Sequence, residues 1–261
     1  MNAKNEILKK WYTTLQFSSK YDEAFEALLA DENLVVRDTF TKNAAENFLS
    51  ALYQCEQLEQ KYIEKGIDLQ VFRDTMQDIV RWTNIWYGMT GELGLMETDW
   101  LTRHFSMRLF GVGRLQYCFG NAHVDAPEMG MKKGDAILEV HIPSGDSLNI
   151  EECKASIAAA KAFYAKHYPE YAYECFTCHS WLLDKTLEKF LAPEANILKF
   201  QRLFHVVEDD PSDAAIRFIF RWDGSREKLP QYQAKSNLAK KVKDYVLAGG
   251  TMYQSYGVFR K

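Results

Sequence analysis

The spacing of apolar residues changes once along the chain, at the Gly111-Val-Gly113 sequence. Before this point the apolar residues recur at intervals of three and four, which is typical of amphipathic helices. The pattern predicts helices over residues 4–17, 20–30, 42–65, 71–86 and 97–109. After this point, polar–apolar alternation or short apolar runs predict strands over residues 114–119, 137–142, 173–178, 204–207 and 216–221. We therefore expect an all-helical part followed by a part that contains a β-sheet.

Further helical segments separate the strands of the second part, over residues 149–166, 182–190 and 236–247. Strands that alternate with helices predict a mixed sheet with helices packed against it. The 261 residues are enough for two modest domains. The predicted fold class is α+β, with a helical domain over residues 1–107 and a domain with a mixed sheet flanked by helices over residues 108–261.

Composition narrows the classes of function. The 32 Lys and Arg residues against 36 Asp and Glu residues leave a net charge of −4, whereas general nucleic-acid binding requires a basic excess. We find no run of 18 apolar residues and no apolar segment near the start, so we expect no membrane span, no signal peptide and a cytoplasmic location. Five cysteines, an odd number, favour reduced core thiols over a disulfide framework.

The predicted strand over residues 137–142 carries the most chemistry. Side chains alternate across a strand, so Glu139 and His141 share one face and lie about 7 Å apart along the backbone. A carboxylate and an imidazole so placed can remove a proton from a substrate. On the strand over 114–119, Arg114, Gln116 and Cys118 also share a face, and pairing of the two strands would bring both polar faces to one cleft. The alternative is a structural His–Glu pair.

A loop with a glycine connects this strand to the next predicted helix. Asn149 and Glu152 have the spacing of a capping box, which predicts that the helix begins there. A strand, a glycine-containing loop and a helix start can together offer backbone N–H groups to a phosphate. Glu151 and Glu152 place negative charge in the first turn, which opposes a nearby pyrophosphate.

The Cys175-x-x-Cys178-His179 sequence has the spacing of some metal and haem sites. There is no second Cys/His pair at zinc-finger spacing, and on a strand the two cysteines would face opposite sides, so we expect no metal. His179 and Ser180 end a predicted strand, where α/β proteins commonly bind ligands. These two residues leave a serine hydrolase open as an alternative, although G-x-S-x-G, Walker and G-x-G-x-x-G sequences are absent.

Several segments of the second half carry a resemblance to a known family. They are GRLQY (113–117), LEVHIPSG (138–145), ECKASIAAAKAFY (152–164), CHSWLL (178–183), NILKF (196–200) and LP (229–230). The chain resembles a bacterial acyltransferase-like family that joins a helical N-terminal domain, the N-acyltransferase N-terminal domain, to a GNAT-like C-terminal domain. The resemblance implies acyl transfer from an acyl-CoA co-substrate to a small-molecule acceptor, often an amine.

The resemblance also implies where acyl-CoA binds. It places the acyl-CoA between the strands over 137–142 and 173–178, and the pyrophosphate on the loop over 143–149. The co-substrate residues would be Ile142, Ser144, Gly145, Asp146, Ser147 and Asn149. The superfamily's usual phosphate signature, a Gln or Arg followed by a Gly-rich run, does not occur after His141. That departure keeps a non-catalytic GNAT-like binding module open as an alternative function.

Catalytic roles follow from the resemblance and from the strand phase together. Glu139 or His141 would act as the base, and backbone N–H groups near Ile142 would stabilise the oxyanion. Tyr173 or Ser180 would protonate the leaving thiolate. The substrate pocket would include Arg114, Gln116, His179 and Trp181.

Overall fold

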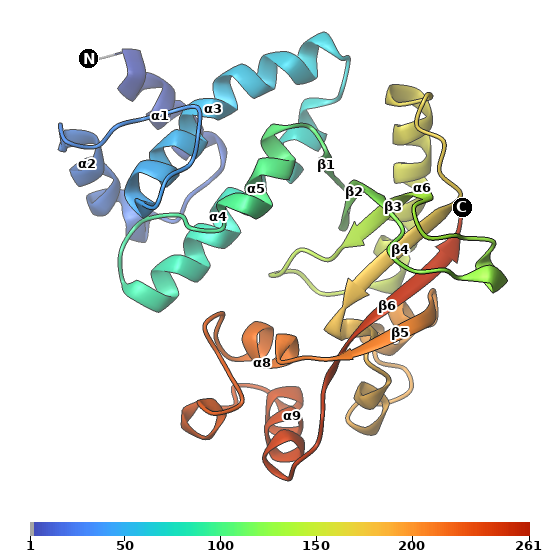
Figure 1. Ribbon diagram of the computed structural model, residues 1–261. Helices are drawn as coiled ribbons and strands as arrows, with labels where there is room; N and C mark the ends of the chain where they lie inside the picture. Colours follow the sequence, from blue (N-terminus) through green and yellow to red (C-terminus); the bar gives the residue numbers. More distant parts are fainter. Residues whose placement is uncertain (1–2) are drawn as a thin grey trace. The chain divides into compact units, whose positions relative to one another are not determined.

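The computed structural model describes residues 3–261, and Figure 1 shows their helices and strands. The chain divides into two compact units. The first unit runs to Gln116 and includes Pro143–Gly145, and the second comprises Tyr117–Ile142 and Asp146–Lys261. The loop after the strand with Glu139 therefore contributes residues to both units.

Helices account for most of the first unit. They are α1 (Ala3–Thr14), α2 (Asp22–Ala30), α3 (Ala44–Glu64), α4 (Leu69–Thr90) and α5 (Thr98–Phe105). Each of the five helices expected from the apolar spacing is present. Local chemistry sets the bounds of these helices: the Asn43 side chain accepts the Ala45 and Glu46 N–H groups at the start of α3, and Gly91 ends α4 at a φ of 76°.

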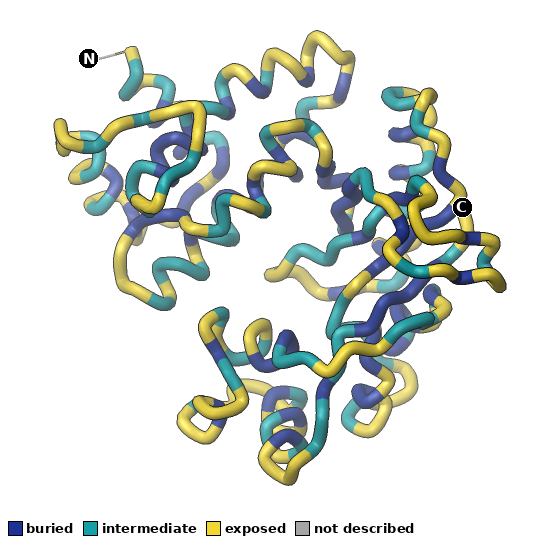
Figure 2. The backbone as a smooth tube through the Cα atoms, viewed as in Figure 1, coloured by how far each residue is buried: buried dark blue, intermediate teal, exposed yellow. Residues whose placement is uncertain are grey.

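Aromatic rings fill the core of the first unit. The Phe72 ring lies edge-on to Trp11 and Tyr62, at centroid distances of 5.3 and 5.1 Å, and all three residues are fully buried. Such pairs contribute about 0.5–1.5 kcal/mol each beyond the area they bury. Buried residues recur along α3 and α4, as the dark blue segments of these helices in Figure 2 show.

Six strands form one mixed sheet in the order β1-β2-β3-β4-β6-β5. The strands are β1 (Leu109–Val112), β2 (Leu115–Asn121), β3 (Ala136–His141), β4 (Cys175–Ser180), β5 (His205–Pro211) and β6 (Tyr253–Arg260). β3 and β4 are parallel, whereas β6 is antiparallel to both β4 and β5. The predicted fold class, helices followed by a mixed sheet with flanking helices, is confirmed.

Helices accompany the sheet of the second unit. They are α6 (Ile150–His167), α7 (Asn196–Gln201), α8 (Ala214–Ile219) and α9 (Asn237–Leu247). α6 packs on β2 through Tyr117, whose hydroxyl lies 2.9 Å from that of Ser156 and whose carbonyl accepts from the Tyr164 hydroxyl. The segment predicted as a helix over 182–190 instead forms two 3-10 turns, and Asp184 caps the second through the Thr186 N–H group.

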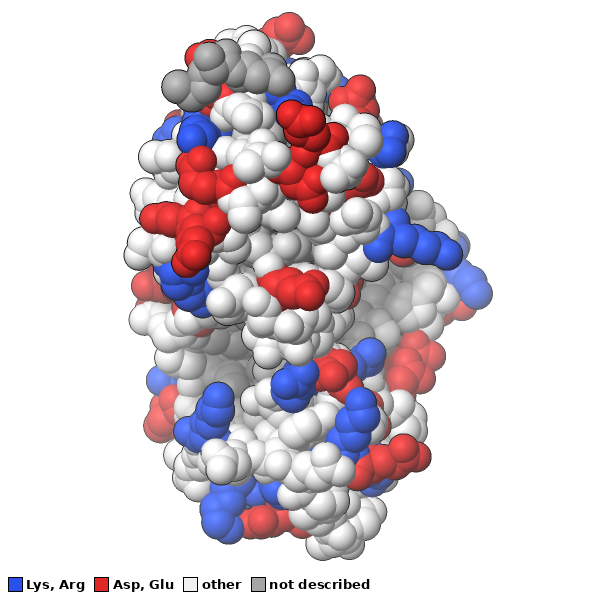
Figure 3. Space-filling view, turned by 90° about the vertical axis from the view of Figure 1, so that its left-hand side faces the viewer, with Lys and Arg blue, Asp and Glu red and all other residues white. Residues whose placement is uncertain are grey.

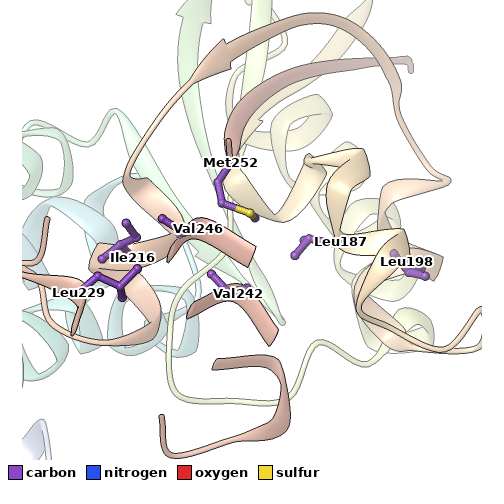
Figure 4. Packing of buried hydrophobic residues seen from close by; sticks show 8 residues of the cluster. Leu187, Leu198, Ile216, Leu229, Val242, Val246 and Met252 are labelled. Atoms are coloured by element: carbon purple, nitrogen blue, oxygen red, sulfur yellow. The ribbon is translucent and has the colours of Figure 1, made fainter. Parts of the chain in front are cut away.

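Two predictions for the C-terminal third were wrong. Residues 216–219 lie in α8 and residues 220–221 follow it, so this segment is not a strand: Ala215 and Ile216 are fully buried while Phe218 is 51% exposed. Ala215 and Ile216 of α8 belong to a core cluster, part of which Figure 4 shows. This cluster comprises Leu187, Leu198, Ala215, Ile216, Leu229, Val242, Val246 and Met252. The second error is the omission of β6, which pairs along its length with β4 and β5.

Charge and sulfur chemistry are ordinary across the described residues. Acidic and basic side chains are interspersed on the face shown in Figure 3, in keeping with the net charge of −4. All five cysteines are buried, and no disulfide joins them within residues 3–261. Within residues 3–261, no helix has both the length and the apolar character needed to cross a membrane.

Candidate active site

The parallel pair β3 and β4 forms the centre of the candidate site. Its register runs from Ile137 opposite Cys175 to Glu139 opposite Thr177. Both strands continue beyond these pairs, β3 to His141 and β4 to Ser180, where β4 pairs with β6. The carboxyl ends of parallel strands are where α/β sheets commonly bind ligands.

Glu139 and His141 lie together on one face of β3, as the strand phase predicted. The His141 Nε2 atom is 3.3 Å from Glu139 Oε2, and the two side chains are 27% and 31% exposed. Gly120 of β2 makes room for this pair, because a Cβ at that position would lie 2.7 Å from Glu139 Oε1. The Tyr171 hydroxyl donates to the carbonyls of Gly120 and Ile137, at 2.8 and 2.9 Å, and so holds β2 beside β3.

A row of titratable side chains crosses the neighbouring strands. His179 of β4 is opposite Tyr256 of β6, which in turn is opposite Glu208 of β5. Residues directly opposite each other share a face, so this row lies on the same side of the sheet as Glu139 and its partner Thr177. The row was absent from the sequence prediction because β6 was not recognised.

His123, in the segment between β2 and β3, covers the row. Its ring centroid is 4.1 Å from that of Tyr256 and 6.0 Å from that of His179, and its Nε2 atom is 3.2 Å from Glu208 Oε2. Because no periodic pattern includes this residue, the sequence contains no signal that could have placed it. The Tyr, Val and Phe residues of 253–260, directly after Gly249-Gly250, were a signal for β6 that the prediction did not use.

His179 has the electrostatic environment of a proton acceptor. Burial lowers its pKa below 6.5, and the nearby His123 lowers it further, so the imidazole is neutral at neutral pH. The Asp210 carboxylate, 3.8 Å from His179 Nε2, acts in the opposite direction and stabilises the imidazolium. The side chain is 39% exposed and can reach a ligand.

Tyr256 is a buried tyrosine on the same face. Only 3% of the residue is exposed, and burial raises the pKa of its hydroxyl, while the Thr177 hydroxyl acts in the opposite direction. The phenol is therefore protonated at neutral pH.

The structure does not bring Tyr173, which the sequence predicted as an acid for the thiolate, to this group. Tyr173 precedes β4, and Thr177, the partner of Glu139, lies four residues further along, about 13 Å at the rise of a strand. Its ring packs on Phe176 at 5.3 Å, and burial raises the pKa of its hydroxyl to about 12. These contacts are those of a core residue.

Ser180 and Trp181 follow His179 at the end of β4. The Ser180 hydroxyl accepts the Leu182 N–H group at 3.1 Å and caps the turn that Trp181 begins. Adjacent residues of a strand face opposite sides, so Ser180 and His179 do not form a nucleophile–base pair. This geometry removes the support for a serine hydrolase, and it places Ser180 on the face opposite Glu139. Trp181 packs against the core cluster of Figure 4.

Arg114 and Gln116, predicted to line the substrate pocket, belong to the first unit. Arg114 precedes β2, and one of its terminal nitrogens donates to the Pro143 carbonyl at 3.1 Å. Gln116 is 2% exposed, and its side-chain nitrogen has no hydrogen-bond partner among the described residues. Arg114 thus contacts the predicted phosphate loop, whereas Gln116 is a core residue of β2.

The predicted phosphate loop joins β3 to α6 and includes Ile142, Ser144, Gly145, Asp146, Ser147 and Asn149. Gly145 adopts a φ of 111°, which only glycine reaches without strain. Asn149 caps α6, as predicted, because its side-chain oxygen accepts the N–H groups of Glu151 and Glu152 at 2.9 and 3.3 Å. These two donors of the first helical turn are therefore occupied by the protein itself.

Residues 3–261 contain no group of three or more His, Cys, Asp or Glu side chains arranged to hold a metal ion. Cys175 and Cys178 lie on opposite faces of β4, as the strand phase predicted, and the Cys175 thiol donates to the Met129 carbonyl.

The fold and the polar group at the carboxyl ends of β3 and β4 define a GNAT-like acyltransferase architecture. Residues 10–107 match the N-acyltransferase N-terminal domain, and residues 109–259 match the GNAT-like C-terminal domain. The chain belongs to this family, and the resemblance noted from its sequence is confirmed. No curated protein sequence matches the chain significantly.

The solved structures described next resemble this chain, and each is an acyltransferase. One, in complex with decanoyl-CoA, has 25% sequence identity and a TM-score of 0.78, with 96% of this chain and 86% of that chain covered. A second, in complex with decanoyl-CoA and teicoplanin, has 23% identity and a TM-score of 0.71, with 81% and 65% covered. A mutant acyltransferase in complex with octanoyl-CoA has 22% identity and a TM-score of 0.72, with 82% and 66% covered. This chain thus spans slightly less than two thirds of the last two chains.

Proposed function

We propose that this protein transfers an acyl group from acyl-CoA to a small-molecule acceptor, with an amine as the nucleophile. The observation that carries the proposal concerns the parallel strands β3 and β4. Their pairing ends at Glu139 and Thr177, and an imidazole follows on each strand, His141 on β3 and His179 on β4. The domain assignments and the acyl-CoA complexes of similar structures support it. We place the domains at residues 1–107 and 108–261, and the reaction in the cytoplasm.

The Glu139–His141 pair is assigned the role of base. The Glu139 carboxylate, 3.3 Å from the imidazole, orients His141 and stabilises it when it is protonated. The acceptor amine attacks the thioester carbonyl, and His141 removes its proton. A C–N bond forms, the C–S bond breaks, and backbone N–H groups near Ile142 stabilise the oxyanion between the two steps.

Tyr256 replaces Tyr173 and Ser180 as the proposed acid. Its protonated hydroxyl lies on the face of Glu139 and His179, and we assign to it the proton that the departing thiolate takes. The tyrosinate then recovers a proton from the imidazolium formed in the first step. Free CoA and the acylated acceptor are the products.

His179 is the second candidate for the base, and its lowered pKa favours it. Single variants separate the two assignments. If His141→Ala abolishes turnover and His179→Ala reduces it only a few fold, the base is the Glu139–His141 pair. The reverse result assigns the base to His179 and Asp210.

We propose a medium-chain acyl-CoA as the donor. The similar structures hold octanoyl-CoA and decanoyl-CoA. The 36 aromatic residues of this chain, 16 Phe, 14 Tyr and 6 Trp, supply apolar surface beyond what a short acyl group requires.

Thermal unfolding with CoA, acetyl-CoA, octanoyl-CoA and decanoyl-CoA tests the proposal. A ligand at 100 times its dissociation constant stabilises the native state by about 2.7 kcal/mol. For a protein of this size the midpoint rises by about 5–10 °C. The acyl chain with the largest shift identifies the donor. No shift with any of the four ligands contradicts the transferase and favours the non-catalytic binding module.

A further inference from the structure

A carboxylate is buried in the helical unit. Asp78 of α4 is 3% exposed and accepts three hydrogen bonds. The donors are a terminal nitrogen of Arg81 at 2.8 Å, the Trp100 indole at 2.8 Å and His104 Nε2 at 2.9 Å. Burial by itself would raise the pKa of Asp78, but His104, Arg81 and Trp100 lower it below its usual range. Asp78 is therefore a buried anion.

Burying a charge is costly, and a buried ion pair is weak evidence for stability by itself. One member of this group, Arg81, also contacts the loop that follows β3. Arg81 uses one terminal nitrogen for Asp78 and its Nε atom for the Ser144 carbonyl, at 3.1 Å. A planar guanidinium with fixed donors transmits the orientation of one partner to the other. The buried group thus fixes the position of a loop carbonyl.

Arg114 makes an equivalent contact with the preceding residue of the loop, because one of its terminal nitrogens donates to the Pro143 carbonyl at 3.1 Å. Two arginines of the first unit therefore hold two successive carbonyls of the segment Pro143–Gly145, which belongs to the same unit. In a planar trans peptide the C=O and the N–H point in opposite directions. With the carbonyls of Pro143 and Ser144 held by guanidinium groups, the N–H groups of Ser144 and Gly145 are turned away from them.

Backbone N–H groups presented in this way form an anion site. The loop lacks the Gly-rich run that usually sets such a backbone in the GNAT superfamily, and Asn149 already occupies two donors of α6. Residues outside the loop must then orient its N–H groups, and Arg81 and Arg114 do so through the Ser144 and Pro143 carbonyls.

We propose that Arg81, held by the buried Asp78–Trp100–His104 group, is a positioning residue that turns the Ser144 and Gly145 N–H groups toward the pyrophosphate of acyl-CoA. This inference rests on the proposed function. It adds that the helical unit controls affinity for the phosphate-bearing part of the co-substrate.

The test compares two ligands that differ in their phosphates. Isothermal titration measures binding of decanoyl-CoA and of decanoyl-pantetheine, which lacks the pyrophosphate, to the full chain and its variants. We expect Arg81→Ala and Arg81→Lys to raise the dissociation constant of decanoyl-CoA at least about tenfold, the effect of losing one hydrogen bond to a charged group. Lysine fails because its donors share one nitrogen on a flexible stem, whereas Arg81 reaches Asp78 and Ser144 through two separate nitrogens of a rigid plane. Binding of decanoyl-pantetheine stays unchanged.

A matched control is Arg73→Ala on the same helix, where the guanidinium is exposed and bonds Gln70. It leaves both dissociation constants unchanged. A merely structural role for Arg81 predicts an equal loss for both ligands, and that result overturns the inference. Equal decanoyl-CoA affinity in wild type and Arg81→Lys also overturns it while leaving the proposed function intact. If wild type binds neither ligand, the proposed function and the inference both fail.

Discussion

The imidazole of His141 lies 3.3 Å from the carboxylate of Glu139, two residues earlier on the same strand. Both side chains are about one third exposed, so water or an acceptor can reach them. The contact occurs where the pairing between β3 and β4 ends. This relationship places a proton acceptor beside the position proposed for the thioester.

Substituting either residue of this pair tests its role. We expect Glu139→Gln and His141→Ala to lower acyl transfer from decanoyl-CoA to an amine by about 10²–10⁴-fold, the usual contribution of a positioned base. The release of CoA, followed with a thiol reagent, measures the rate. Binding of decanoyl-CoA stays within about twofold because neither side chain is assigned to the phosphates. The control is His167→Ala at the end of α6, and full turnover by both site variants would disprove the assignment.

Acid titration tests the environment of His179. Its folded-state pKa lies below the unfolded value of 6.5, so its contribution to stability is complete above pH 6.5 and is lost as the pH falls through that value toward the folded pKa. His123→Ala removes an imidazole that lowers the pKa of His179, and Asp210→Asn removes a carboxylate that raises it. We therefore expect the first variant to raise the titration midpoint of His179 and the second to lower it.

Nuclear magnetic resonance of the histidine ring protons measures these midpoints. Glu208 also raises the pKa of His179, so Glu208→Gln shifts the midpoint in the same direction as Asp210→Asn. A midpoint for His179 at or above 6.5 in the wild type contradicts the predicted environment.

Gly120→Ala tests whether Glu139 needs the space that is left because Gly120 has no side chain. A methyl group there would lie 2.7 Å from Glu139 Oε1 and 2.8 Å from its Cγ, so the carboxylate must move away from His141. We expect a loss of turnover together with a destabilisation of about 1–3 kcal/mol, typical of overpacking. Gly88→Ala is the control, because no atom lies within 4 Å of the added carbon on α4, and it is stabilising by about 0.5–1 kcal/mol. Urea unfolding and the CoA-release assay measure both effects, and unchanged turnover in Gly120→Ala would show that the carboxylate position is unimportant.

Two substitutions of Asn149 distinguish its role as the cap of α6 from its effect on phosphate binding. Asn149→Ala removes the acceptor of the Glu151 and Glu152 N–H groups, and we expect a loss of about 1 kcal/mol in stability. Asn149→Asp keeps the cap and preserves stability, but it adds a negative charge beside the loop and weakens binding of CoA. Thermal unfolding with and without CoA measures the two quantities. Equal CoA binding by the wild type and by the Asn149→Asp variant would place the pyrophosphate elsewhere.

Local patterns were sufficient for the elements that their own sequence defines. The five helices of the first unit, the strand with Glu139 and His141, and the cap at Asn149 were all predicted correctly, since each depends on spacing within a few residues. Residues 216–221 were predicted as a strand because Ile216, Phe218 and Phe220 alternate. Burial of Ala215 and Ile216 in the core cluster favours a helix there.

The resemblance to acyltransferases was also visible in the sequence, because segments such as LEVHIPSG and CHSWLL are contiguous. The site residues that lie outside such segments could not be identified from the sequence. His123 reaches Tyr256 and Glu208 from a loop without periodicity, and β6 brings Tyr256 beside His179 from a distant part of the chain.

The sequence by itself determined the order of the five helices in the first unit, the shared face of Glu139 and His141, and the family. These properties depend on the period of the backbone and on contiguous residues. The tertiary structure alone decided which distant side chains meet: Glu208, Tyr256 and His179 in one row, and Asp78, Arg81 and Ser144 in one chain of contacts. Strand order and helix packing bring these residues together. The burial of apolar surface over the whole chain determines that order and packing, and no local spacing in the sequence encodes them.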